Sequence, residues 1–337
     1  MQFPATIRIK TKPMNSTLFH LVTGGTPGLQ QDADIAQAVL QGNHPVSLNV
    51  LHRANLHLPH RQLALGLRKP FSRRRNIMIF FENLSRSWMR CGDASILIPN
   101  QEWMRPHTTQ LIRDCHEIWC KSRYAERIFL ERGLSVRYIG FSSNDMYLPD
   151  VQKDYAACIH IAGRSELKGT ATLLKVWKRH PEWPTLTVVS RHHYLQRHRS
   201  SNIDIVTDYL DRSSLQMLMN RAGIHLCPSE TEGFGHYISE ALSTQAIVIT
   251  THAPPMNELV HENFGFLAGF AGCCPVGYGE RFQVDADSLE IAITRALALT
   301  VREKTSMGER ARASFLANGS QFEANFLEAA TNLAQDY

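Results

Sequence analysis

The segment that most constrains the fold spans residues 224–242. It begins with a short apolar run at 224–227, which predicts a buried β-strand. A Gly-Phe-Gly turn at 233–235 follows, and the residues after it predict a helix. A strand, a glycine turn and a helix in this order bind phosphate, because backbone N–H groups and the helix dipole converge on the anion. Two carboxylates, Glu232 and Glu240, flank the turn. Since they would repel a phosphate, we expect them to face hydroxyl groups, as on a sugar.

Predicted strands and helices alternate along the chain in two series. The first places strands at 17–23, 46–51, 77–81, 95–98 and 117–120, a tight turn at 24–28, and helices at 32–40 and 122–131. After a polar link at 143–153, the second places strands at 156–162, 186–190, 203–207, 224–227, 247–251 and 264–268, a loop at 269–279, and helices at 170–179, 215–221, 287–299 and 303–316. Such alternation predicts two Rossmann-like, doubly wound α/β domains with parallel sheets, one at 1–150 and one at 151–319.

The bulk composition is that of a globular protein. With 337 residues, 43% hydrophobic and 20% charged, the chain is long enough for two domains. No stretch reaches the roughly 18 uncharged apolar residues that span a membrane, and the first residues lack the layout of a secretion signal. The seven cysteines are scattered and form no C-x-x-C pair, which favours reduced thiols. We expect a cytoplasmic protein, with association to a membrane surface left open.

Positive charge is concentrated in the first half of the chain. Residues 1–150 carry 19 Lys and Arg against 11 Asp and Glu, a net charge of +8, whereas the remainder carries 17 against 20, a net charge of −3. The densest basic run lies at 68–75. This asymmetry indicates an anionic partner for the first half, such as a membrane surface or nucleic acid, although a solvated basic loop explains it equally well.

Two motifs together resemble those of retaining glycosyltransferases of family 4. The first is Glu232-x7-Glu240, with the glycine turn inside it and Pro-Ser at 228–229 before it. The second is a strand that ends in Gly-Arg at 163–164, followed by Lys-Gly at 168–169 and a helix, with one residue fewer between Arg164 and Lys168 than is common in the family. The resemblance implies the two-lobed B-type architecture, in which donor and acceptor meet in a cleft and a last helix, here 320–337, packs back on the first lobe.

The resemblance also implies roles for individual residues. Arg164 and Lys168 would clamp the diphosphate of the donor, which agrees with the fixed fork of arginine and the point charge of lysine. Glu232 would act beside the transferred sugar, and Glu240 would bind the ribose hydroxyls. The further residues expected at the donor are all in glycine turns: Gly24, Gly25, Gly233, Phe234 and Gly235. A plain turn is the alternative reading of Gly24 and Gly25.

The acceptor side is less clearly marked. Glu102 lies at the end of a predicted strand, where it would either orient an acceptor hydroxyl or serve only as the acidic start of a helix. His107 follows it as a second acceptor-side candidate. The 16 histidines form no H-x-H or H-E-x-x-H pattern on a predicted helix, so the sequence predicts no metal site and no cofactor.

The resemblance implies a retaining, metal-independent hexosyl- or pentosyltransferase that uses a nucleoside-diphosphate sugar, and this is the function we expect. The expected acceptor is a hydroxyl of a cell-surface glycan or lipid-linked saccharide. Two alternatives stay open. One is a glycosyltransferase acting on hydroxylated DNA bases, as in phage DNA modification, which the basic first half permits. The other is a nucleotide-sugar-binding protein without catalysis, since fold alone does not establish activity.

Overall fold

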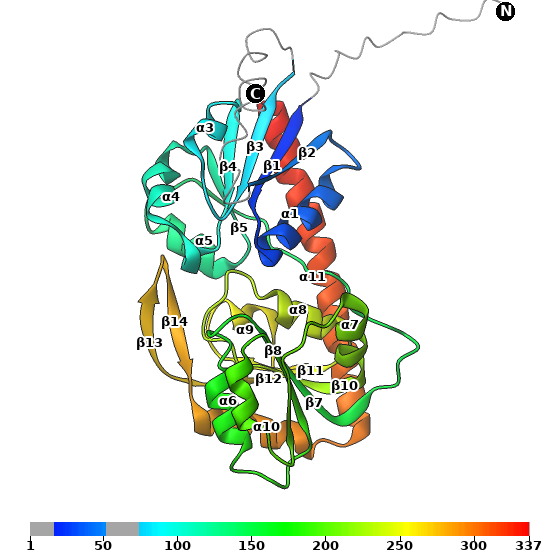
Figure 1. Ribbon diagram of the computed structural model, residues 1–337. Helices are drawn as coiled ribbons and strands as arrows, with labels where there is room; N and C mark the ends of the chain where they lie inside the picture. The colour runs from blue at the N-terminus through cyan, green and yellow to red at the C-terminus, as the bar shows by residue number, and fades with distance from the viewer. Residues whose placement is uncertain (1–16, 52–73, 337) are drawn as a thin grey trace, which may run out of the picture.

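The computed structural model describes residues 17–51 and 74–336. Two α/β domains lie one above the other (Figure 1), and each is built on a six-stranded, wholly parallel sheet. The first sheet has the strand order β2-β1-β3-β4-β5-β6 and the second β12-β11-β10-β7-β8-β9. The predicted fold class, two Rossmann-like α/β domains, is confirmed.

The strands of the first sheet are β1 (Leu18–Gly24), β2 (Val46–Leu51), β3 (Asn76–Phe81), β4 (Ala94–Ile98), β5 (Glu117–Cys120) and β6 (Val136–Tyr138). Those of the second sheet are β7 (Asp154–Gly163), β8 (Leu186–Ser190), β9 (Ile203–Val206), β10 (Ala222–Cys227), β11 (Ile247–Thr251) and β12 (Gly265–Ala268). Every residue of β3, β4, β10 and β11 is buried, as near-continuous apolar runs in the centre of a parallel sheet require.

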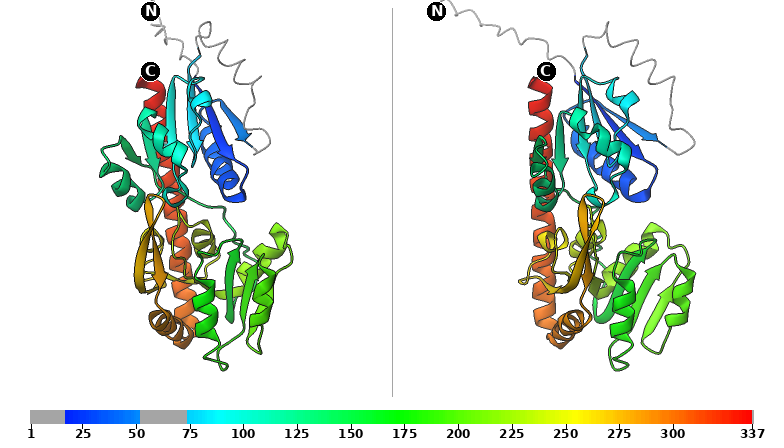
Figure 2. Two further views of the ribbon diagram at one scale, coloured as in Figure 1. Left: turned by 60° about the vertical axis from the view of Figure 1, so that its left-hand side comes forward. Right: turned by 90° about the vertical axis from the view of Figure 1, so that its left-hand side faces the viewer.

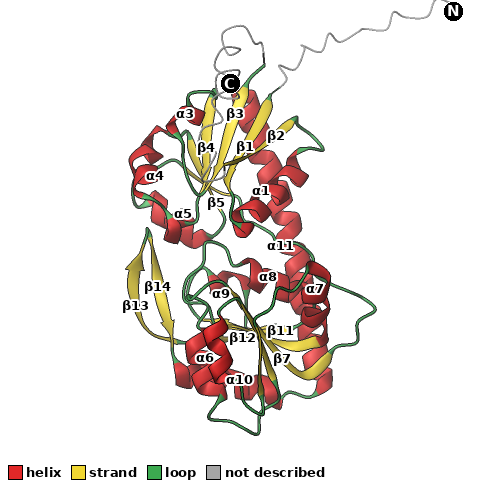
Figure 3. Cartoon of the chain, in the orientation of Figure 1, coloured by secondary structure: helices red, strands yellow, loops and turns green. Residues whose placement is uncertain are grey.

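Helices cover both sheets (Figure 3). In the first domain they are α1 (Pro27–Leu40), α3 (Arg86–Met89), α4 (Pro106–Leu111) and α5 (Arg123–Leu130), with 3-10 turns η3 (Gln101–Trp103) and η4 (Ile112–Asp114). In the second they are α6 (Thr170–Trp177), α7 (Arg212–Arg221), α8 (His236–Ser243), α9 (Met256–Leu259) and α10 (Ala286–Ala298), with 3-10 turn η5 (His193–His198). No helix of residues 17–51 and 74–336 is long and apolar enough to cross a bilayer.

The start of α1 corrects one prediction. The helix was expected at 32–40 after a tight turn at 24–28, but it begins at Pro27. Thr26 caps it by accepting a hydrogen bond from the Leu29 backbone N–H, and proline at the first helical position is already set to the helical φ angle. As a result Gly24 is the last residue of β1, and Gly25 alone lies between the strand and the helix cap Thr26.

The prediction of a loop at residues 269–279 is wrong. These residues form most of an antiparallel hairpin of β13 (Phe270–Val276) and β14 (Gly279–Val284). Gly277, at the turn, has a φ of +56°, and a Cβ there would lie 2.5 Å from the Gln101 carbonyl oxygen. The Tyr278 backbone N–H donates to that same oxygen at 2.8 Å. The hairpin therefore reaches across from the second domain and docks on η3 of the first (Figure 1).

The C-terminal residues form one helix, α11 (Val301–Asp336), where two separate helical segments were expected. Gly319 lies between the two expected segments, and the helix continues through it. The helix runs along both domains (Figure 2). Near its end, Phe326 packs edge-on against Trp119 of β5 at 5.3 Å between ring centroids. Arg75, from the basic run whose residues 68–73 lie outside the described residues, donates to the Ala334 carbonyl oxygen at 3.3 Å.

Replacing Phe326 by alanine should lower the free energy of unfolding by about 3–5 kcal/mol, because the ring is fully buried against the first domain. Leu316→Ala on the same helix is the matched control, since Leu316 is 49% exposed and should cost well under about 1 kcal/mol. Urea denaturation measures both. Equal effects of the two substitutions would show that α11 does not stabilise the first domain.

Candidate active site

A cavity of about 730 Å³ lies between the two domains. The first domain lines it with the start of α1 (Thr26 and Gly28) and with Glu102 and Trp103 of η3. The second domain contributes the residues of the loop after β7, one residue after β8 and two after β10: Arg164, Ser165, Glu166, Leu167, Lys168, His192, Thr231 and Glu232. The cavity thus lies at the carboxyl ends of parallel strands, where open α/β sheets bind their ligands.

The loop that carries Arg164 and Lys168 is shaped by two glycines in left-handed conformations. Gly163 ends β7 with a φ of +57°, and Gly169 caps α6 with a φ of +66°. At Gly169 a Cβ would lie 2.1 Å from the Pro228 carbonyl oxygen, which is backbone and cannot move aside. The loop after β7 and the loop after β10 therefore meet closely, and this contact brings Lys168 next to Glu232.

Gly169→Ala should lower the free energy of unfolding by about 2–4 kcal/mol, because it combines an unfavourable φ with a backbone clash. Gly28→Ala is the control. It lies in helix α1, and a Cβ there would have no neighbour within 4 Å, so alanine should be neutral or stabilise by up to about 1 kcal/mol. Thermal denaturation compares the two variants. A neutral Gly169→Ala would show that the two loops do not approach as closely as described.

Lys168 and Glu232 form an ion pair at the wall of the cavity, with side chains only 17% and 12% exposed. The Lys168 ammonium also lies 3.8 Å from the centroid of the Tyr237 ring. The Ser229 hydroxyl donates to the same Glu232 oxygen that Lys168 contacts. Both charged groups are therefore held in place, and an anion that enters the cavity competes with Glu232 for Lys168.

Arg164 lines the same cavity with an exposed side chain that has no ion-pair partner among the described residues. Its carbonyl oxygen contacts His192 Nε2 at 3.2 Å. The structure thus brings together the sequence-predicted residues Arg164, Lys168 and Glu232, with Glu102 facing them from the first domain. A guanidinium and an ammonium at one wall suit the oxygens of a diphosphate.

The turn at 233–235 touches the first domain. A Cβ on Gly233 would lie 2.2 Å from Asn100 Oδ1, and Gly235 caps α8 with a φ of +105°. Phe234 packs on Phe141 at 5.6 Å between ring centroids and does not line the interdomain cavity. The turn is therefore part of the interface between the domains.

Glu240 does not line the cavity either. Its carboxylate accepts a hydrogen bond from Gln31 Nε2 of α1 at 2.7 Å, and burial raises its pKa. A ribose that is to bind Glu240 must therefore share the carboxylate with Gln31 or take its place. The predicted role of Glu240 as a donor-binding residue stays a prediction.

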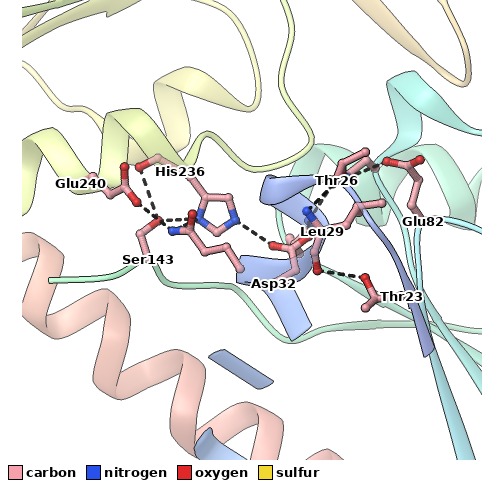
Figure 4. A network of polar contacts seen from close by, with 11 residues as sticks. Thr23, Thr26, Leu29, Asp32, Glu82, Ser143, His236 and Glu240 are labelled. Atoms are coloured by element: carbon pink, nitrogen blue, oxygen red, sulfur yellow. Dashed lines mark hydrogen bonds and ion pairs between the residues drawn. The ribbon is translucent and has the colours of Figure 1, made fainter. Parts of the chain in front are cut away.

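A polar network around Asp32 connects the domains and was missed by sequence reasoning (Figure 4). Asp32 Oδ1 lies 2.8 Å from Nε2 of His236, the first residue of α8, and Oδ2 accepts from Lys121 Nζ at 2.8 Å. His236 Nδ1 lies 2.7 Å from the Ser143 hydroxyl. Burial alone would raise the pKa of Asp32, but Lys121 and His236 outweigh it and lower the pKa. The sequence feature that could have pointed to this network is His236, which directly follows the Gly-Phe-Gly turn.

Glu102 is the unusual group of the cavity. It is 6% exposed, and its Oε2 has no hydrogen-bond partner among the described residues. Burial, with a contribution from nearby Glu232, raises the pKa of Glu102 to about 8. At neutral pH the group is therefore mostly a protonated carboxyl, which can donate a hydrogen bond as well as accept one.

Glu102→Gln should change how stability depends on pH. In the unfolded chain this carboxyl has a pKa near 4.5, so its contribution to stability is fully present below about pH 4.5 and is lost as the pH rises through about 8. Between pH 5 and 9 the wild-type protein should lose on the order of 4 kcal/mol relative to Glu102→Gln. Urea denaturation across this range measures it, with Glu166→Gln, an exposed acid of the same cavity, as control. Parallel curves for wild type and Glu102→Gln would contradict the burial of an unpaired carboxyl.

Three other predicted residues line a second cavity, of about 760 Å³, within the first domain. They are Gly24, Gly25 and His107. Thr26 lines both cavities, so the two adjoin at the cap of α1. In residues 17–51 and 74–336 no group of three or more His, Cys, Asp or Glu side chains is placed to hold a metal ion.

Residues 164–313 match the family model of glycosyl transferases group 1. This stretch therefore resembles a group 1 glycosyl transferase domain. It begins at Arg164 and includes the loop with Lys168, the Glu232 to Glu240 segment and the first part of α11. Among curated proteins no sequence matches this chain significantly.

Solved structures share the architecture of both domains. Sucrose-phosphate synthase from Thermosynechococcus elongatus is 15% identical with a TM-score of 0.71, covering 95% of this chain and 98% of its own. A glycosyltransferase from Rickettsia africae ESF-5 has the same identity and TM-score, with 96% and 98% covered. A protein described as trehalose-6-phosphate from E. coli, bound with UDP-2-fluoro glucose, is 10% identical with a TM-score of 0.67, covering 95% and 99%. At these identities the likeness establishes the fold, and the predicted B-type glycosyltransferase architecture is confirmed.

Proposed function

We propose that the protein is a retaining, metal-independent glycosyltransferase that moves a sugar from a nucleoside diphosphate to an acceptor hydroxyl. The observation that carries the proposal is the interdomain cavity, which gathers Arg164, Lys168 and Glu232 from the second domain and Glu102 from the first. These groups supply the two functions that the transfer needs, cations for the leaving diphosphate and carboxyl groups for sugar hydroxyls.

Arg164 and Lys168 act on the leaving group. Negative charge grows on the diphosphate as the glycosidic bond breaks, and the two cations of the interdomain cavity stabilise that charge. Because these two side chains already provide the positive charge, the proposed reaction needs no divalent ion. Lys168 exchanges its contact with Glu232 for a phosphate oxygen when the donor binds.

Glu232 and Glu102 act on the transferred sugar. Once Lys168 turns to the phosphate, the Glu232 carboxylate accepts hydrogen bonds from sugar hydroxyls, while the protonated Glu102 faces the sugar from the other domain. The Ser229 hydroxyl still donates to Glu232 after that exchange, which suits a hydrogen-bonding group better than a free nucleophile.

Retention then follows from front-face displacement. The acceptor oxygen forms its bond to the anomeric carbon on the face from which the diphosphate departs, the bond from that carbon to the phosphate oxygen breaks, and the acceptor proton passes to the departing phosphate oxygen. The cavity of the first domain, which adjoins the donor cavity at Thr26, supplies the acceptor from this side. We propose a uridine diphosphate sugar as the first donor to test, since the E. coli structure holds UDP-2-fluoro glucose.

Lys168→Ala and Arg164→Ala should each lower the rate of UDP release from UDP-glucose by at least about 100-fold, because each removes a cation from the leaving group. Lys175→Ala is the matched control: it removes an exposed lysine from α6 of the same domain, outside the cavity, and should retain wild-type activity. If the wild-type protein turns over the donor and both cavity variants keep full activity, the proposed mechanism is ruled out. Binding of UDP-glucose without turnover would favour the non-catalytic alternative.

A further inference from the structure

We propose that the acceptor carries a phosphate group, and that it binds in the cavity of the first domain with this phosphate on Arg86 and Arg105 and its reacting hydroxyl toward Glu82. The inference rests on the proposed function, because it assigns the acceptor of the same transfer. It concerns a cavity separate from the one that holds the donor groups.

The position of the cavity suits an acceptor. It lies at the carboxyl ends of β1 and β3, and it adjoins the donor cavity at Thr26. Its volume of about 760 Å³ is in the range of small-molecule sites. Its apolar lining consists of residues that are buried or half-buried: Val22, Leu29, Leu51, Phe81, Leu84 and Leu111. A sugar ring or a short carbon chain can pack its C–H groups on such a surface.

The exposed part of the lining contains two guanidiniums. Arg86 and Arg105 both line the cavity with exposed side chains. Arg86 has only a weak ion pair, 3.8 Å from Asp114, in which both side chains are more than half exposed. Arg105 has no ion-pair partner among the described residues. Two guanidinium forks on one cavity fit the several oxygens of a phosphate better than they fit a neutral sugar.

The lining of the cavity carries one carboxylate, that of Glu82. Glu82 has a φ of +68°, an uncommon and costly conformation for a residue other than glycine, and such strain is frequent at binding sites. Its oxygens accept hydrogen bonds from Asn83 Nδ2 at 2.8 Å and Asn100 Nδ2 at 3.1 Å. These contacts fix the carboxylate where it can accept a hydrogen bond from an acceptor hydroxyl.

The cavity lining therefore carries one carboxylate and two guanidiniums. An acceptor with both a phosphate and hydroxyls matches this lining, because the phosphate pairs with the arginines while Glu82 would repel the phosphate and accept from a hydroxyl. The phosphate can belong to a soluble sugar phosphate or to a phosphorylated lipid, and the contacts in the cavity are the same for both.

Isothermal titration calorimetry in the presence of UDP tests the proposal. The soluble probes are inorganic phosphate, glycerol 3-phosphate and glucose 6-phosphate, with glycerol and glucose as neutral matches. Vesicles of phosphatidylcholine with and without phosphatidic acid test the lipid source. The variants are Arg86→Gln, Arg105→Gln and the double substitution, with Arg90→Gln as control, since Arg90 is an exposed arginine next to α3 that does not line the cavity.

We expect at least one phosphate probe to bind the wild type, the double substitution to weaken that binding at least about 10-fold, and the Arg90→Gln control and the affinity for UDP to stay within about 2-fold. Binding of phosphatidic acid vesicles alone, with the same dependence on the arginines, also supports the proposal and assigns the lipid source. The proposal is overturned if UDP still binds but the phosphate probes bind equally well without the two arginines. It is also overturned if the neutral matches bind more tightly than the phosphate probes. Absence of UDP binding by the wild type instead overturns the proposed function on which it rests.

Discussion

The buried carboxylate of Asp32 fixes the relative position of the two domains. It comes from the first domain, is 2% exposed, and contacts Lys121 of its own domain and His236 of the other at 2.8 Å each. Removal of either partner would leave a charge uncompensated away from water, which typically costs several kcal/mol, so the pairing favours one arrangement of the domains. Because His236 is the first residue of α8, this contact also positions the helix that carries Glu240.

The same network continues to the cavity of the first domain. Asn100 Oδ1 accepts from Lys121 Nζ at 2.6 Å, and Asn100 Nδ2 donates to Glu82. The Asn100 side chain also lies so close to the turn after Glu232 that only glycine fits at 233. One amide thus contacts the Glu82 carboxylate of that cavity, the cation that holds Asp32, and the turn that follows Glu232 of the interdomain cavity. The two cavities are therefore aligned by direct contacts, and the hairpin that docks on η3 adds a further contact between the domains.

The sequence predicted the parts whose signals are local, and missed those that arise between distant segments. Apolar runs gave both sheets, and glycines next to Arg164 and Lys168 gave the loop at the cavity. The hairpin was missed because its first strand contains glycine and proline and is exposed, so it lacks the apolar–polar alternation of a half-buried strand. Contacts of Asp32 with His236, 204 residues apart, leave no periodic pattern. The raised pKa of Glu102 likewise depends on burial between two domains, which spacing along the chain does not show.

The central claim is that the interdomain cavity binds the diphosphate of a nucleotide sugar. Thermal denaturation with a panel of nucleoside diphosphates and their sugars, in the presence of EDTA, tests it most directly, because a ligand that binds only the folded state raises the melting temperature. We predict a clear rise with one nucleotide family, at least halved in Arg164→Ala and Lys168→Ala and unchanged in Lys175→Ala. A panel without any rise, or a rise that is the same in all three variants, would contradict the assignment of the cavity.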